Sequence, residues 1–218
     1  MNPLVIGCRT TENELMAAMK ECGCSFPLVW IEAQLHNVKP KLKSAIQKIL
    51  DDNSGYDVIL FATGFCGNSI TGLKSREIPL IIPRVDDCTS LLLGGSRNKA
   101  QHLDSYFLTE GWLKGKDNIW AEYSRAVDRY GKEKADHIFS LMFTHYRRIS
   151  LLDTGCYAIA PNLEKAQAIA EAFSLECEVL PAGYSLFKEL LTGPWEEKHF
   201  LKIPPNTEIT QEMLRIFD

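Results

Sequence analysis

The first half of the chain alternates short apolar runs with amphipathic segments. In the segment from 40 to 50, Leu42, Ile46 and Ile49 fall on one helical face and lysines fall on the other. Thr11 and Glu14 have the spacing of a capping box, which predicts a helix start. The pattern predicts strands at 3–8, 26–31, 57–61 and 78–83, and helices at 10–22 and 40–50.

Strands that alternate with helices pair in parallel through right-handed crossovers. We therefore predict an α/β fold, a Rossmann- or flavodoxin-like parallel sheet with helices on both faces. In the flavodoxin-like order, the first, third and fourth strands lie side by side.

The second half follows a different pattern. An aromatic stretch spans 105–113, and a mostly helical segment spans 118–148 with a break near Gly131. A shorter α/β portion follows, with strands expected at 157–160, 177–180 and 199–203 and helices at 163–173 and 184–191. We divide the chain into a βα half (1–104), a mainly helical segment (105–155) and a smaller α/β portion (156–218) that packs on the first half.

Three cysteines stand at the ends of three apolar strands. Cys8 closes the first, Cys66 follows the third and Cys88 follows the fourth. The carboxyl ends of parallel strands meet at one edge of a sheet, where ligands bind. Thiolates are ligands for zinc and for iron–sulfur clusters, so three of them predict a metal site with one open position. Zinc and a 4Fe–4S cluster both fit the sequence, and simple packing of each thiol is the alternative.

Two glycine-containing turns are candidates for binding an anion or cofactor. The first contains Gly64, Gly67, Asn68 and Ser69, but it lacks the Gly-Lys-Ser/Thr ending of a nucleotide-binding P-loop. Its glycines also suit a sharp turn that exposes Cys66. The second contains Gly94 and Ser96, and a plain turn is its alternative.

Three polar side chains near the strand ends are candidates for catalysis. His36 follows the second strand, where an imidazole suits a metal ligand or a proton carrier. Arg84 is suited to hold a substrate carboxylate, and Asp87 to orient a ligand; a local salt bridge is the alternative for both. Cys156 is a further candidate ligand. The aromatic stretch that contains Tyr106, Phe107 and Trp112 either covers the crevice or closes the core.

Composition excludes several classes of protein. The net charge of −4 argues against a nucleic-acid partner or an anionic membrane surface. No apolar run is long enough to span a membrane, and the N-terminus lacks the pattern of a signal peptide. Seven cysteines without a repeating framework do not suit a disulfide scaffold. These features predict a cytoplasmic protein with reduced thiols.

Three blocks of sequence resemble the domain-of-unknown-function 1638 family of bacteria and archaea. They are Gly64–Leu73, Pro83–Ser96 and Tyr106–Trp112, in that order along the chain. The Leu35–His36 pair and the Asp153–Gly155 segment also fit the family pattern. The resemblance implies an association with corrinoid-dependent methyl-transfer systems and no settled activity.

The expected function is binding of a metal or cluster that activates a small-molecule substrate, which suits a metal-dependent transferase or lyase. One-carbon or corrinoid methyl metabolism is the context that the resemblance implies. The first alternative is a non-catalytic accessory protein that binds a metal, a corrinoid protein or a methyltransferase. The second is metal-free chemistry with Cys66 as nucleophile.

Overall fold

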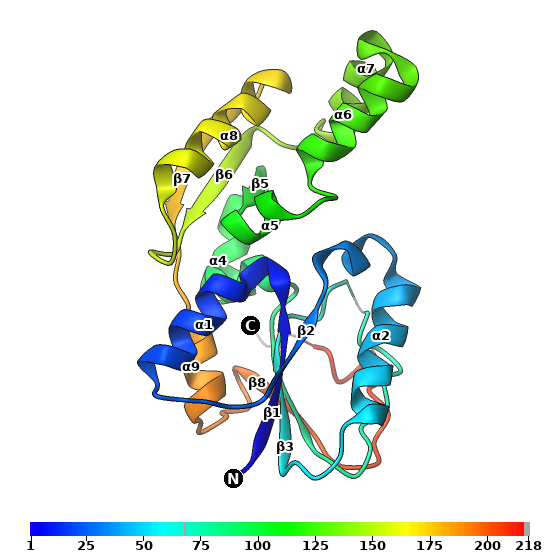
Figure 1. The fold of residues 1–218 in the computed structure, drawn as a ribbon, viewed down its shortest axis with the longest axis vertical. Coiled ribbons are helices and arrows are strands. Elements are labelled where there is room, and N and C mark those ends of the chain that lie inside the picture. The colour runs from blue at the N-terminus through cyan, green and yellow to red at the C-terminus, as the bar shows by residue number, and fades with distance from the viewer. Residues whose placement is uncertain (68, 216–218) are drawn as a thin grey trace.

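The computed structural model describes residues 1–67 and 69–215 and contains one mostly parallel sheet and one parallel sheet, with helices packed on each (Figure 1). The first sheet has five strands in the order β2-β1-β3-β4-β8. All its neighbouring pairs are parallel except β4 and β8, which are antiparallel. The strands are β1 (Pro3–Cys8), β2 (Leu28–Ile31), β3 (Val58–Ala62), β4 (Leu80–Pro83) and β8 (Phe200–Ile203).

Apolar runs form the central strands because both faces of the sheet are covered. Every residue of β1, β3 and β4 is buried, as expected for a parallel sheet between two layers of helices. Helix α2 (Lys39–Asp52) covers one face. Helices α1 (Glu12–Glu21) and α9 (Ser185–Thr192) cover the other. The predicted α/β class and the adjacency of the first, third and fourth strands are confirmed.

The second sheet consists of three parallel strands in the order β5-β6-β7. Helix α8 packs on it, and the α6–α7 hairpin extends to the far end of the molecule (Figure 1). The elements are β5 (Ser105–Leu108), β6 (Arg148–Asp153), β7 (Glu176–Pro181), α5 (Glu110–Lys114), α6 (Ile119–Tyr130), α7 (Lys132–Met142) and α8 (Ile159–Ala172). The short helices α3 (Cys88–Leu92) and α4 (Ser96–Lys99) connect the two parts.

Two expectations about the second half differ from the structure. The strand expected at 157–160 lies instead in a turn and the first turn of α8, and the strand is β6, at Arg148–Asp153. Asp153 ends that strand because its carboxylate accepts a hydrogen bond from the Gly155 backbone. In the portion 156–218, β7 belongs to the second sheet and α8 packs on it. Strand β8 belongs to the first sheet, and α9 packs on that sheet.

The predicted capping box at the start of α1 is wrong. The Thr11 hydroxyl donates to the Cys8 carbonyl at 3.3 Å and does not cap the helix. Glu14 is 1 % exposed, and its carboxylate accepts a hydrogen bond from the Thr154 hydroxyl at 2.8 Å. Burial raises the pKa of Glu14, and the Thr154 bond opposes that rise. This acidic side chain therefore joins α1 to the loop after β6.

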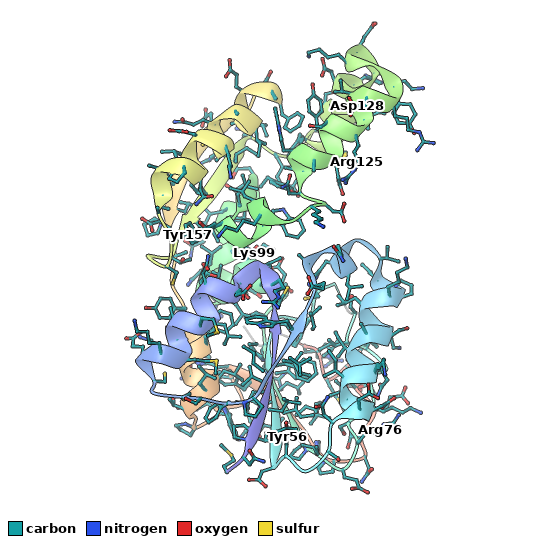
Figure 2. All side chains as sticks on the ribbon, in the orientation of Figure 1. Tyr56, Arg76, Lys99, Arg125, Asp128 and Tyr157 are labelled. Carbon is teal, nitrogen blue, oxygen red and sulfur yellow. The ribbon has the colours of Figure 1, made fainter. Side chains whose placement is uncertain are left out.

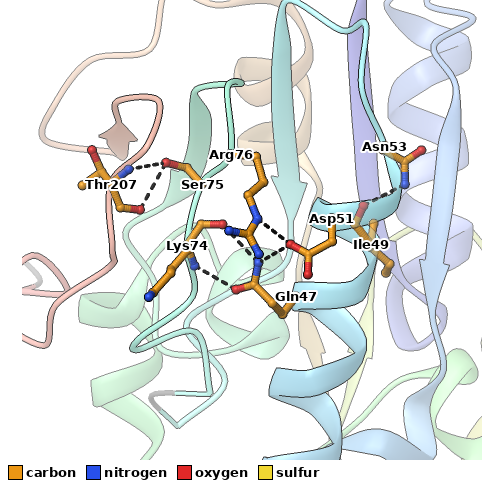
Figure 3. Close-up of polar contacts among 8 residues, drawn as sticks. All are labelled: Gln47, Ile49, Asp51, Asn53, Lys74, Ser75, Arg76 and Thr207. Atoms are coloured by element: carbon orange, nitrogen blue, oxygen red, sulfur yellow. Dashed lines mark hydrogen bonds and ion pairs between the residues drawn. The ribbon is translucent and has the colours of Figure 1, made fainter.

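The end of α2 that lies away from the cysteine edge is fixed by polar contacts (Figure 3). The Arg76 guanidinium pairs with Asp51 at 2.6 Å. The Gln47 side chain both accepts from the Lys74 backbone N–H, at 2.8 Å, and donates to the Lys74 carbonyl, at 3.2 Å. These contacts hold the helix in register with the loop before β4, and so position Lys39 at its opposite end. No helix among the described residues has the length and apolar character that a bilayer span requires.

Candidate metal centre

The thiols of Cys8, Cys66 and Cys88 lie together at the carboxyl edge of the first sheet. Cys8 is the last residue of β1, Cys66 lies in the loop after β3, and Cys88 is the first residue of α3. The Cys88 thiol lies near enough to Cys8 and Cys66 for these groups to shift one another's pKa values. Cys8 is fully buried, and the other two are partly exposed. Side chains from three separate strand ends therefore form one cluster of sulfur atoms.

His36 extends this cluster to a nitrogen atom. Its Nε2 lies 3.2 Å from the Cys8 Sγ, and the Thr10 hydroxyl lies 3.0 Å from the same sulfur. Burial lowers the pKa of His36, but its contact with Cys8 and the nearby Asp87 charge outweigh burial and raise it. The second strand thus brings an imidazole to the cysteine that the first strand supplies.

Gly64 brings the Cys66 loop against the Cys88 loop. A Cβ at Gly64 would lie 2.6 Å from the backbone nitrogen and Cα of Asp87, so only glycine allows this approach. Across the same contact, the Phe65 and Cys66 N–H groups donate to the carbonyls of Val85 and Asp86 at 2.8 and 2.7 Å. The close backbone contact explains why the Cys66 and Cys88 thiols meet.

The backbone at Cys66 is in the left-handed region, with φ of +49°, and Gly67 follows with φ of +62°. A side chain other than glycine is uncommon there, and such strain concentrates at functional sites. The Ser69 hydroxyl stabilises this conformation by donating to the Cys66 carbonyl at 2.7 Å. Ser69 is therefore engaged with the loop itself, and Asn68, expected beside it as an anion donor, lies outside the described residues.

Two of the three thiols, Cys8 and Cys88, have raised pKa values. The pKa of Cys8 is raised, first by its hydrogen bond with Cys88 and then by burial. The pKa of Cys88 is also raised, first by its hydrogen bond with Cys66. Within the described part of the chain, no three Cys, His, Asp or Glu side chains already surround one point as a preformed coordination sphere. Cys8 and Cys88 are therefore held as neutral thiols.

A cavity of about 650 Å³ opens beside the cluster, between the first sheet and the second. This volume is within the range of small-molecule sites. One wall carries His36, Lys39, Cys66, Gly67, Asp87 and Cys88, and the opposite wall carries Ser105, Tyr106, Phe107, Thr109, Trp112 and Tyr146. A molecule in this cavity would reach Cys66 and Cys88 directly.

The aromatic stretch forms the second wall of the cavity. Burial raises the pKa of Tyr106, and the neighbouring Trp112 side chain opposes that rise. The Thr109 hydroxyl bonds to the Thr10 carbonyl at 3.2 Å, and a Cβ at Gly111 would overlap that same carbonyl. The start of α5 is thus attached to the loop that follows Cys8.

Asp87 lies in the cavity wall but is engaged by neighbouring groups. Its carboxylate caps α3 by accepting from the Ser90 N–H at 2.9 Å, and it forms an ion pair with Lys99. Figure 2 shows Lys99 at the junction of the two parts, far from Arg125 and Asp128 on α6. This arrangement is the local ion pair that the sequence left open as an alternative.

The structure separates Arg84, Gly94 and Ser96 from the cysteines. The Arg84 guanidinium donates to the carbonyls of Glu197, Met213 and Arg215, between 2.7 and 3.1 Å. The Ser96 hydroxyl accepts from the Asp86 N–H at 3.0 Å. Arg84, Gly94 and Ser96 line a different cavity, of about 450 Å³. Cys156 lies away from the cluster as well, since its thiol bonds to the Thr154 carbonyl at 3.6 Å.

The sequence did not reveal several residues of the cavity. Among these residues, only Thr10 could have been predicted from the sequence, because it stands two residues after Cys8. Lys39 belongs to a row of lysines on an amphipathic helix, a pattern typical of a solvated face. Ser105 and Tyr146 enter the site only because the second sheet packs beside the first.

Comparison with known proteins identifies the family. Residues 30–191 match the model of the family described as "Protein of unknown function (DUF1638)", about three quarters of the chain. The chain belongs to this family. The DUF1638 match includes His36, Cys66, Cys88 and the aromatic stretch, whereas Cys8 precedes it. No curated protein and no solved structure matches the chain.

Proposed function

We propose that this DUF1638 protein is a metal-dependent enzyme in which Cys8, Cys66 and Cys88 bind one ion, with a coordination position open to the cavity. The observation that carries the proposal is that the Cys88 thiol lies near both other thiols, beside a cavity of about 650 Å³. Three thiolates and one exchangeable position are typical of a catalytic rather than a structural zinc site.

The mutual effects of Cys88 with Cys8 and Cys66 on their pKa values suit a single ion better than a cluster, because they require the thiols to lie close together. With Zn–S bonds of about 2.3 Å, tetrahedral geometry puts neighbouring thiolates a little under about 4 Å apart, near contact distance. A 4Fe–4S cluster interposes irons and sulfides between its cysteines, so it requires wider separation. Zinc is therefore the cofactor that we favour. Binding requires the three thiols to lose protons and turn toward a common point, because no preformed sphere exists among the described residues.

His36 has two possible places in this chemistry. Its Nε2, 3.2 Å from the Cys8 Sγ, is near enough to take the fourth position or to accept a proton at that edge of the site. Because the cavity reaches the Cys66 and Cys88 side of the cluster, we favour the proton carrier and leave the fourth position to substrate.

A bound zinc ion supplies Lewis acidity that lowers the pKa of a coordinated thiol, alcohol or water. The protein supplies the rest: the aromatic wall of Tyr106 and Trp112 excludes water, and His36 moves protons. Activation of a substrate thiol for methyl transfer, with a corrinoid protein or methyltransferase as partner, is the reaction that we propose within this class. The seven free cysteines support a reducing, cytoplasmic setting.

A second candidate is metal-free catalysis by Cys66. The observation in its favour is the left-handed backbone that presents this thiol at the cavity. It differs from the first proposal in one respect that is simple to measure: it needs Cys66 alone, whereas the metal site needs all three cysteines.

Metal analysis of anaerobically purified protein tests these proposals. We expect one zinc ion per chain, lost in Cys8→Ala, Cys66→Ala and Cys88→Ala. The control Cys177→Ala, on β7, should retain it. Retention of metal by all three single variants would refute the common site. Brown protein that contains iron and sulfide would show that the site holds a cluster instead of zinc. Metal bound without turnover is the result that an accessory role predicts.

A further inference from the structure

Lys39 is a cation in the cavity wall without a counter-ion. No carboxylate of the described residues lies within ion-pairing distance of its ammonium, and it makes no hydrogen bond with them. The other lysine of the cavity, Lys99, is neutralised by Asp87. One uncompensated positive charge therefore faces the space beside the cysteines.

The Lys39 ammonium lies next to the Cys66 loop. Its Nζ is 3.2 Å from the point that a Cβ on Gly67 would occupy, so the two residues are in contact. An anionic group held by Lys39 would consequently lie beside Cys66. The absence of a side chain at Gly67 leaves room for this approach.

Ser105, on the opposite wall, has an unused hydrogen-bonding group. Its side-chain oxygen is buried and has no hydrogen-bond partner among the described residues, and the residue is only 4 % exposed. Buried hydroxyls nearly always have partners, so an orphan in a cavity wall marks a point where a ligand bonds. Phe107 and Trp112 supply flat apolar surface on the same wall.

From these observations we infer that the cavity binds a small carboxylate with a flat apolar body. Lys39 recognises the carboxylate, Phe107 and Trp112 contact the body, and Ser105 bonds a polar atom on it. As a statement about the substrate class of the proposed enzyme, the inference rests on the proposed function. Binding of the carboxylate itself does not require metal.

A pair of probes that differ only in charge tests the inference: 3-phenylpropionate and the neutral 3-phenylpropanamide, titrated calorimetrically into the full chain. We expect the carboxylate to bind about tenfold more tightly, the size of one charge-assisted hydrogen bond. Lys39→Met should abolish that preference and Lys39→Arg should keep it. Lys41→Met, on the same helix but outside the cavity wall, should match the wild type.

Equal binding of the two probes by the wild type, no binding of either, or an unchanged preference in Lys39→Met would overturn the inference. Titrations are run on metal-free and on zinc-loaded protein. Failure of the chain to retain zinc refutes the metal site, whereas equal binding of the two probes by metal-free wild-type protein refutes the role of Lys39. The two failures are therefore distinguishable.

Discussion

Replacement of Gly64 by alanine is expected to separate the loops that bring Cys66 and Cys88 together. The added Cβ would lie 2.6 Å from the Asp87 nitrogen and Cα and 2.7 Å from its carbonyl carbon, whereas ordinary contacts begin at 3.4 Å. All three atoms are backbone, so no side chain can rotate away. The loop carrying Cys88 must therefore retreat by about 0.8 Å.

The energetic cost of that retreat follows from the packing. Overpacking of a close contact costs about 1–3 kcal/mol of unfolding free energy. Gly64 and Phe65 are buried, and the Phe65 and Cys66 N–H groups bond to carbonyls across the same contact. Lengthening these two bonds adds to the loss, so we expect Gly64→Ala to fall in the upper half of that range.

Urea unfolding and zinc titration measure the two consequences. Gly183→Ala is the matched control, because a Cβ there meets no heavy atom within 4 Å. We expect the control to change stability by less than about 1 kcal/mol and to bind zinc as the wild type does. Unaltered stability and zinc affinity in Gly64→Ala would show that the close contact does not position the thiols.

Three further outcomes are expected. Because burial raises the pKa of Glu14 above its ordinary 4.5, the folded state holds this proton longer than the unfolded chain does, and stability falls as pH rises through the raised pKa. Glu14→Gln, whose amide still accepts from Thr154, should remove this pH dependence of stability, measured as the urea midpoint between about pH 4 and 8. A fall of the midpoint with pH equal to that of the wild type would contradict this account. Gly111→Ala, which would press on the Thr10 carbonyl, should lower unfolding free energy by about 1–3 kcal/mol in the same assay, and wild-type stability would argue against tight docking of α5. Cys156→Ser should leave bound metal unchanged by elemental analysis, and metal loss would add Cys156 to the site.

The sheet order was predictable because alternating βα units leave few possible topologies. Strand β6 was not predictable, because Ile149 fits the apolar period of the preceding helix as well as it fits a strand. Pairing with β5 and β7 decides the structure there. Strand β8 was expected at nearly the right residues, but its antiparallel pairing with β4 depends on how the chain returns from the second sheet.

The candidate site, like the fold, was predictable only in part. The sequence placed the cysteines at strand ends, and topology alone brings such ends to one edge. The partners of Arg84 are backbone carbonyls near the C-terminus, which no local pattern reveals. Lys39 and Ser105 line one cavity only because one part of the molecule packs against the other.

The central claim is that three thiols from three strand ends hold one ion. Zinc-edge X-ray absorption on protein loaded with one equivalent of zinc tests it most directly. The account predicts three sulfur neighbours at about 2.3 Å and one lighter ligand, and loss of this sulfur shell together with the zinc ion in Cys88→Ala. A zinc environment of nitrogen and oxygen alone, or a sulfur count that Cys88→Ala leaves unchanged, would contradict it.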